Sequence, residues 1–105
     1  MDINLKIKKQ IEENSILLYM KGSPDVPKCG FSAQAVQALT SINKRFAYID
    51  VLEHQDIRQA LPKYANWPTF PQLWVNGELI GGCNIILELL NTGELEQVIS
   101  KVKIN

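Results

Sequence analysis

The sequence predicts an α/β fold in which a small mixed β-sheet carries helices on its faces. Two patterns support this prediction. Residues 15–20 and 46–51 are apolar, strand-like runs separated by a helix-like segment, which is the β-α-β order of a parallel strand pair. Residues 69–82 contain two further apolar runs around Asn76-Gly77, a pair that favours a tight hairpin turn, and they add two antiparallel strands.

The first half of the chain alternates between helix and strand patterns. Isoleucines recur every fourth residue between charges and predict an amphipathic helix over roughly 2–13. "SILLYM" (15–20) has the length and composition of a buried strand, and "KGSPDVPK" (21–28) is a loop because it contains a glycine and two prolines. "GFSAQAVQALTSIN" (30–43) predicts a helix. Its apolar positions have helical spacing: Phe31, Ala35, Val36 and Leu39.

The second half continues the alternation. "FAYIDV" (46–51) has the aromatic and β-branched bias of a strand. Residues 54–67 begin as a helix, and we expect Pro62 to end or bend this helix near Leu61. Residues 84–102 predict two helical segments divided at Thr92-Gly93.

Length and composition limit the possible functions. The 105 residues predict one domain over 1–105. Lys+Arg and Asp+Glu both number 11, so no net charge favours nucleic acid or a membrane surface. No apolar run approaches the roughly 20 residues that cross a bilayer, and residues 1–14 lack the apolar core of a signal peptide. We therefore expect a cytoplasmic protein whose thiols are kept reduced.

The chain contains two cysteines, Cys29 and Cys83, and one histidine, His54. These are too few ligands for a zinc site closed within one chain, and a disulfide is not expected in a reducing compartment. Cys29 falls between the loop and the helix that follows it. Free N–H groups and nearby Lys21 and Lys28 favour a thiolate there. The alternative is a small buried apolar residue, which the flanking Pro27, Lys28 and Gly30 disfavour.

Ser32 stands where a second cysteine would complete a C-x-x-C pair. A serine cannot resolve a mixed disulfide, so any disulfide chemistry needs an outside thiol such as glutathione. Ser32 can equally be a residue of the first helical turn whose hydroxyl caps an N–H, and the two interpretations are compatible.

Two further segments contain candidate binding residues. Pro71 opens a predicted strand. A cis bond there would leave the neighbouring backbone free to pair with a peptide, although sequence alone slightly favours a trans bond. The helix that starts at Cys83 and Asn84 has free N–H groups that suit a carboxylate. The alternatives are that Asn84 is an N-cap and that Cys83 is a buried structural residue. Trp67 and Trp74 are interpreted as packing residues.

Three motifs in one register closely resemble the monothiol, CGFS-type glutaredoxins in their single-domain bacterial form: "KGSPDVPKCGFS" (21–32), "WPTFPQLWVNGELIGG" (67–82) and Gly81-Gly82-Cys83. The resemblance covers nearly the whole chain. It implies a thioredoxin-like fold with a four-stranded mixed sheet flanked by helices, and a cis bond before Pro71. It also implies a glutathione groove across these residues: Lys21, Cys29, Arg58, Thr69, Phe70, Pro71, Gly82, Cys83 and Asn84.

The residue types suit that ligand. Lys21 and Arg58 can meet the glycyl carboxylate, although either can also be a solvated surface charge. The backbone at Phe70 can pair with the cysteinyl unit, and the N–H groups near Cys83 and Asn84 can hold the γ-glutamyl carboxylate. The family usually has Asp where this chain has Asn84, which brings no charge to the γ-glutamyl ammonium.

The resemblance further implies a bridging [2Fe–2S] cluster. Such a cluster takes four thiolates, which Cys29 from two chains and two glutathiones would supply in a homodimer. The implied role is iron–sulfur cluster transfer and iron homeostasis, with BolA-like proteins and apo iron–sulfur acceptors as partners. The alternative is an enzyme that removes glutathione from protein mixed disulfides by a monothiol route. A third reading, a binding module that does not use its thiol, predicts that Cys29→Ser leaves function intact.

Overall fold

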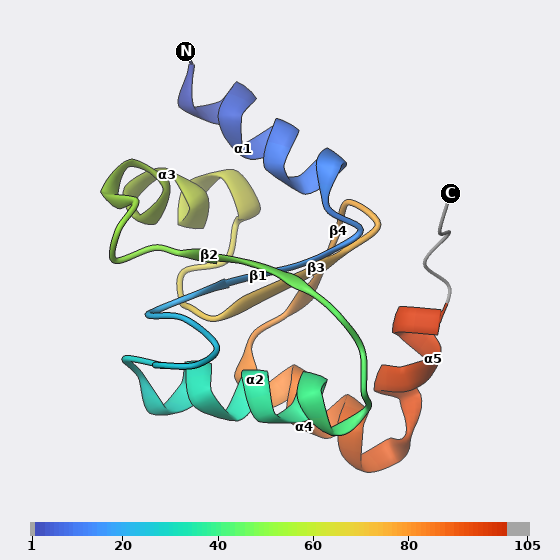
Figure 1. Cartoon of the computed structure of the whole chain (residues 1–105). Helices are drawn as coiled ribbons and strands as arrows, with labels where there is room; N and C mark the ends of the chain where they lie inside the picture. Colours follow the sequence, from blue (N-terminus) through green and yellow to red (C-terminus); the bar gives the residue numbers. More distant parts are fainter. Residues whose placement is uncertain (1, 101–105) are drawn as a thin grey trace.

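The computed structural model describes residues 2–100, which form helices and strands in the predicted order (Figure 1). The helices and strands have these bounds: α1 Ile3–Glu13, β1 Ile16–Met20, α2 Gly30–Ser41, β2 Ala47–Asp50, α3 Gln55–Ala65, β3 Gln72–Val75, β4 Glu78–Gly81, α4 Cys83–Thr92 and α5 Glu94–Ser100. The predicted extension of the last helix to residue 102 lies outside the described residues.

The four strands form one mixed sheet in the order β2-β1-β3-β4. β1 and β2 are parallel, with Leu17 opposite Ala47, whereas β3 pairs antiparallel with both β1 and β4. Asn76 and Gly77 connect β3 to β4 with φ angles of 53° and 81°, the two positive values that a two-residue type I′ turn requires. The predicted mixed sheet and its hairpin are both confirmed.

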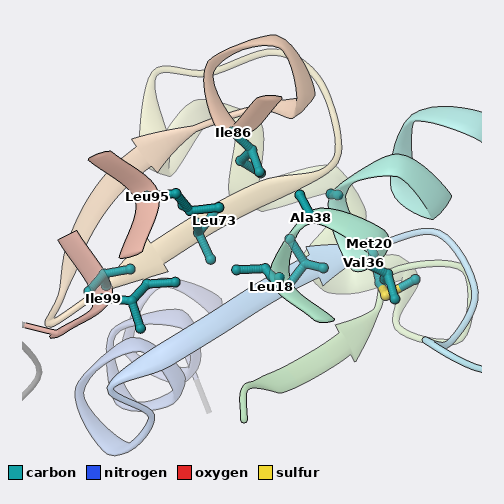
Figure 2. Packing of buried hydrophobic residues seen from close by; sticks show 11 residues of the cluster. Leu18, Met20, Val36, Ala38, Leu73, Ile86, Leu95 and Ile99 are labelled. Atoms are coloured by element: carbon teal, nitrogen blue, oxygen red, sulfur yellow. The ribbon is translucent and has the colours of Figure 1, made fainter. Parts of the chain in front are cut away.

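Helices cover both faces of this sheet, with α1 and α3 on one side and α2, α4 and α5 on the other (Figure 1). Successive residues of β1 face opposite sides, so that Leu18 and Met20 join the core beneath α2 and α4. Figure 2 shows this cluster, in which Leu73 and Ile86 also pack. Leu17 and Tyr19 face the second core, beneath α1 and α3. Burial on both faces explains why β1 is a continuous apolar run.

One prediction about local structure is corrected, and the spacing of one helix needs a qualification. The expected end of the helix near Leu61 is wrong, because α3 continues past Pro62 to Ala65 and stops at Asn66, which has a positive φ of 52°. A proline removes one helical hydrogen bond, but the buried face of α3, with Ile57 and Leu61 at zero exposure, outweighs that loss. Phe31 has helical spacing with Ala35, Val36 and Leu39, yet these three are buried and Phe31 is 61% exposed.

No helix within residues 2–100 has the length and apolar character needed to cross a membrane.

Candidate functional site

Cys29 is the N-cap residue of α2, and its thiol is partly exposed. The N–H groups of the first helical turn lack partners within the helix and point toward this end. The backbone N–H of Ser32 does most to lower the pKa of the Cys29 thiol, and the N–H of Phe31 and the charge on Lys21 lower it further, against the opposing effect of burial. The local structure therefore favours a thiolate at Cys29.

Ser32 is fully buried, and its Oγ accepts a hydrogen bond from the backbone N–H of Lys21 at 3.1 Å. Ser32 is thus a first-turn residue of α2 whose hydroxyl caps an N–H, as predicted, and the donor lies at the start of the loop. The bond joins the start of the loop to α2 and holds Lys21 beside the thiol. The hydroxyl of Ser32 also lowers the pKa of Cys29.

The loop between β1 and α2 has its own hydrogen bonds. Ser23 and Val26 exchange backbone hydrogen bonds of 3.2 and 3.1 Å, and the backbone N–H of Lys28 donates to the carbonyl of Lys21 at 2.9 Å. Gly22 has a φ of 90°, and a Cβ there would lie 2.5 Å from the Val26 carbonyl oxygen, so only glycine fits. Asp50 Oδ1 accepts from the Gly22 N–H at 2.9 Å and ties the loop to the end of β2.

A groove with a volume of about 800 Å³ opens beside the thiol. It brings together eight of the nine predicted site residues: Lys21, Cys29, Arg58, Thr69, Phe70, Gly82, Cys83 and Asn84. Pro71 is buried and does not line the groove, and its bond to Phe70 is cis, as the resemblance implies. Sequence reasoning missed these lining residues: Phe31, Pro62, Trp67, Pro68 and Ile85. Two of them, Pro68 and Ile85, adjoin the predicted site residues Thr69 and Asn84 in sequence, and this adjacency is the signal that could have found them.

A buried glutamine positions one wall of the groove. The side-chain amide of Gln72 has no exposed surface, and its Nε2 donates to the carbonyls of Trp67 and Thr69 at 3.0 and 3.3 Å. Its Oε1 accepts from Trp74 Nε1 at 3.2 Å. Trp74 is a core residue, as predicted, whereas Trp67 lines the groove. Gln72 thus fixes the segment that precedes the cis bond from inside the sheet.

The opposite wall is the junction of β4 and α4. Gly82 is the N-cap of α4, so the alternative of an Asn84 cap is wrong, and Asn84 lies exposed in the first turn. A Cβ on Gly82 would lie 3.3 Å from both the Pro71 carbonyl oxygen and Trp67 Nε1, which makes this a close contact between the two walls. The unpartnered N–H groups that start α4 favour an anion here.

Cys83 differs from Cys29 in environment. Its side chain is 7% exposed, and its Sγ donates a hydrogen bond to Gln34 Oε1 at 3.3 Å. Burial raises the pKa of the Cys83 thiol, and the negative charge of Cys29 raises it further. The pKa values of the two free thiols are therefore shifted in opposite directions, so that the fold favours the thiolate at Cys29 and the neutral thiol at Cys83.

Two cations of the groove lack anionic partners. Within the part of the chain that the structure describes, neither Lys21 nor Arg58 forms a salt bridge, and both side chains are half-buried. No group of three or more His, Cys, Asp or Glu residues within 2–100 could hold a metal ion. The groove can thus take an anionic ligand beside a thiolate, but it cannot complete a metal site from its own side chains.

Comparisons with known proteins agree with this fold. The Glutaredoxin family model matches residues 16–80. Glutaredoxin 4 of Buchnera aphidicola subsp. Acyrthosiphon pisum is 67% identical over 103 residues, which cover 98% of this chain and 95% of that protein. Glutaredoxin 4 of Escherichia coli K12 is 67% identical over 96 residues, or 91% of this chain and 84% of that protein.

A solved structure extends the comparison to three dimensions. The solution structure of reduced poplar apo GrxS14 superposes with a TM-score of 0.80 at 41% identity, covering 94% of this chain and 91% of that one. The thioredoxin-like fold that the resemblance implies is thereby confirmed, and so is the resemblance itself. With Ser32 in place of a second active-site cysteine, this chain belongs to the glutaredoxin family, in its monothiol branch.

Proposed function

We propose that this chain binds glutathione in the groove and holds a [2Fe–2S] cluster through Cys29, for transfer to apo iron–sulfur proteins. One observation carries the proposal. A thiolate-favouring cysteine borders a groove with two unpaired cations, while the described residues offer no second accessible thiol. Such a site needs its remaining sulfur ligands from outside the chain.

Glutathione fits the groove by charge and by backbone geometry. Lys21 and Arg58 would meet its glycyl carboxylate, because both are cations without an anionic partner among residues 2–100. The backbone at Phe70, beside Thr69 and the cis bond to Pro71, would pair with the cysteinyl unit. The free N–H groups at Gly82, Cys83 and Asn84 would hold the γ-glutamyl carboxylate.

The cluster stoichiometry follows from the thiol count. A [2Fe–2S] cluster takes four thiolate ligands. Cys83 is unsuited as one of them, because its thiol is buried, neutral and bonded to Gln34. Cys29 of two chains and two bound glutathiones complete the set, so the cluster-bound form is a homodimer. The cluster is then held by one protein ligand per chain, which suits a cargo that must be released.

The partners follow from the family resemblance. Apo iron–sulfur proteins would receive the cluster, and a BolA-like protein would pair with the chain in the cytoplasm. Neither nucleic acid nor a membrane is proposed as a partner, because the formal net charge is zero.

The lowered pKa of Cys29 also permits the second candidate function, deglutathionylation. Its thiolate would attack the glutathione sulfur of a mixed disulfide, and the substrate protein's thiolate would leave. A second glutathione thiolate would then attack the sulfur of the glutathione that is bonded to Cys29. Glutathione disulfide would form, and Cys29 would leave as the thiolate. The long loop from Lys21 to Cys29 disfavours this route. A small displacement of Lys21 or of the glutathione thiol would spoil the in-line attack on the disulfide.

Anaerobic reconstitution with iron, sulfide and glutathione tests the proposal, with visible absorbance and mass as readouts. We expect a cluster band on a dimer that is lost in Cys29→Ser and without glutathione, and retained in Cys83→Ala. No band in the unmodified chain, together with rapid turnover of a glutathionylated protein, would replace the carrier function by the oxidoreductase.

A further inference from the structure

One buried hydrogen-bond donor beside the groove has no partner. The Nε1 of Trp67 is the only buried side-chain nitrogen or oxygen within residues 2–100 that forms no hydrogen bond. The other tryptophan differs, because Trp74 Nε1 donates to Gln72 Oε1 at 3.2 Å. A buried N–H without an acceptor costs free energy, and a phenylalanine would fill similar space without that cost. The indole at this position therefore points to an acceptor that the described residues do not supply.

The backbone of Trp67 is held on both sides, so only its side chain is free to respond to a ligand. Its N–H donates to the carbonyl of Pro62 at 3.0 Å, and its carbonyl accepts from Gln72 Nε2 at 3.0 Å. The indole lines the groove, and the residue is partly exposed although Nε1 itself is covered. A rotation about the side-chain bonds would bring the N–H into the groove without moving the chain.

The indole N–H lies against the wall that begins α4. The point that a Cβ on Gly82 would occupy is 3.3 Å from Trp67 Nε1 and 3.7 Å from Trp67 Cζ2. No Asp or Glu side chain lines the groove, whose charged side chains include the cations Lys21 and Arg58. A carboxylate acceptor for Nε1 can therefore come only from a bound ligand, and it would lie at the start of α4.

We propose that Trp67 is a further glutathione-binding residue, whose Nε1–H donates a hydrogen bond to the γ-glutamyl α-carboxylate. The inference rests on the proposed function, in which the N–H groups that begin α4 hold that carboxylate. Trp67 adds a side-chain donor from the opposite wall, so that the carboxylate bridges the two walls. A ligand without this carboxylate would leave Nε1 unpaired. Trp67 would thus make the groove selective for thiols that carry a carboxylate at this end.

The test compares the dissociation constants of two ligands by NMR titration. One is glutathione, and the other is γ-aminobutyryl-cysteinyl-glycine, which lacks only the γ-glutamyl α-carboxylate. Trp67→Phe keeps an aromatic ring and removes the donor. A hydrogen bond to a charged group is a strong one, so we expect glutathione to bind about tenfold more weakly to Trp67→Phe, and the analogue to bind both chains equally. Tyr64→Phe is the matched control, since Tyr64 is an exposed aromatic residue of α3 outside the groove.

The indole resonances of the unmodified chain give a second measurement, which does not depend on the folding of a variant. The Nε1–H resonance of Trp67 is expected to move downfield as glutathione binds. The resonance of Trp74 should stay in place, because its donor is already bonded to Gln72. Saturation with the analogue should leave both resonances where they are.

The outcomes separate this inference from the proposed function. If glutathione binds the unmodified chain and the Trp67 resonance does not move, the indole donor is refuted while glutathione binding stands. The same conclusion follows if Trp67→Phe weakens both ligands equally, or neither. If the unmodified chain does not bind glutathione, the proposed function fails and this inference fails with it.

Discussion

The Oγ of Ser32 accepts a hydrogen bond from the backbone N–H of Lys21, at 3.1 Å, across the loop that leads to Cys29. The two residues are 11 positions apart, and the carbonyl of Lys21 is bound in turn by the N–H of Lys28 at 2.9 Å. Both backbone groups of Lys21 are thus engaged. The residue that replaces a resolving thiol is therefore also a structural anchor for a cation of the groove.

Replacement of Ser32 by alanine should destabilise the loop and weaken the thiolate. The Lys21 N–H would lose its acceptor, and a partly buried unsatisfied donor costs about 1–3 kcal/mol. We expect the free energy of unfolding, measured by urea denaturation, to fall by about 1 kcal/mol or more, and the pKa of Cys29 to rise. Ser41→Ala is the control, since Ser41 lies exposed at the other end of α2. An equal loss of unfolding free energy in the two variants would contradict the anchoring role of Ser32.

Alkylation of Cys29 should persist at lower pH than alkylation of an ordinary thiol. The pKa of Cys29 is lowered in the fold, so the folded state binds fewer protons than the unfolded state between the two pKa values. The stability that this thiolate contributes is fully present when the pH is above the pKa of Cys29 in the unfolded state. It is lost as the pH falls through the pKa of Cys29 in the folded state. Iodoacetamide rates across pH should reach half-maximum below about 8.5, the free-thiol value.

Lys21 contributes to that shift through its charge, so Lys21→Gln should move the half-maximum upward. Lys9→Gln, on exposed α1 surface, should leave it in place. A rate profile for the folded protein that coincides with the profile in denaturant would contradict the account.

Gly82 and Gly30 offer a matched pair of glycine-to-alanine substitutions. A Cβ on Gly82 would approach the Pro71 carbonyl and Trp67 to 3.3 Å, whereas a Cβ on Gly30 would meet nothing within 4 Å. We expect Gly82→Ala to lower the free energy of unfolding by about 1–2 kcal/mol and to weaken glutathione binding measured by calorimetry. Gly30→Ala should be neutral or slightly stabilising. Unchanged binding in Gly82→Ala would show that the two walls of the groove can separate without cost.

Asn84→Asp should strengthen glutathione binding. Asn84 is exposed in the first turn of α4, where a carboxylate would pair with the γ-glutamyl ammonium. An exposed ion pair contributes about 0.2–1 kcal/mol, so the affinity should rise by a factor of about 1.4 to 5, and the gain should shrink in high salt. A salt-independent gain, or weaker binding, would argue against an ammonium at this position.

Local patterns were sufficient for most of the fold. The apolar run of β1 and the Asn76-Gly77 turn are signals that neighbouring residues determine, and both predicted elements are confirmed. The helix does not end at Pro62, because the buried face of α3 compensates for one lost hydrogen bond. Phe31 shares the helical spacing of the buried Ala35, Val36 and Leu39 but is exposed, and spacing alone does not show where a core ends.

The site was predictable as a set of residues but not as a set of contacts. Eight of the nine predicted residues line one groove. Ser32 and Gln72 position that groove through bonds to Lys21 and to the Trp67 and Thr69 carbonyls. The role of Ser32 depends on a partner far away in sequence. The role of Gln72 depends on burial within the sheet, and a polar residue in a strand gives no sign of it.

The ligand count of the cluster-bound dimer tests the central claim most directly. Iron, sulfide and glutathione would be quantified after acid release from holo protein freed of excess glutathione. The account predicts one glutathione and one iron per chain, unchanged in Cys83→Ala. A cluster that keeps its spectrum without glutathione, or that requires Cys83, would contradict ligation by Cys29 and glutathione.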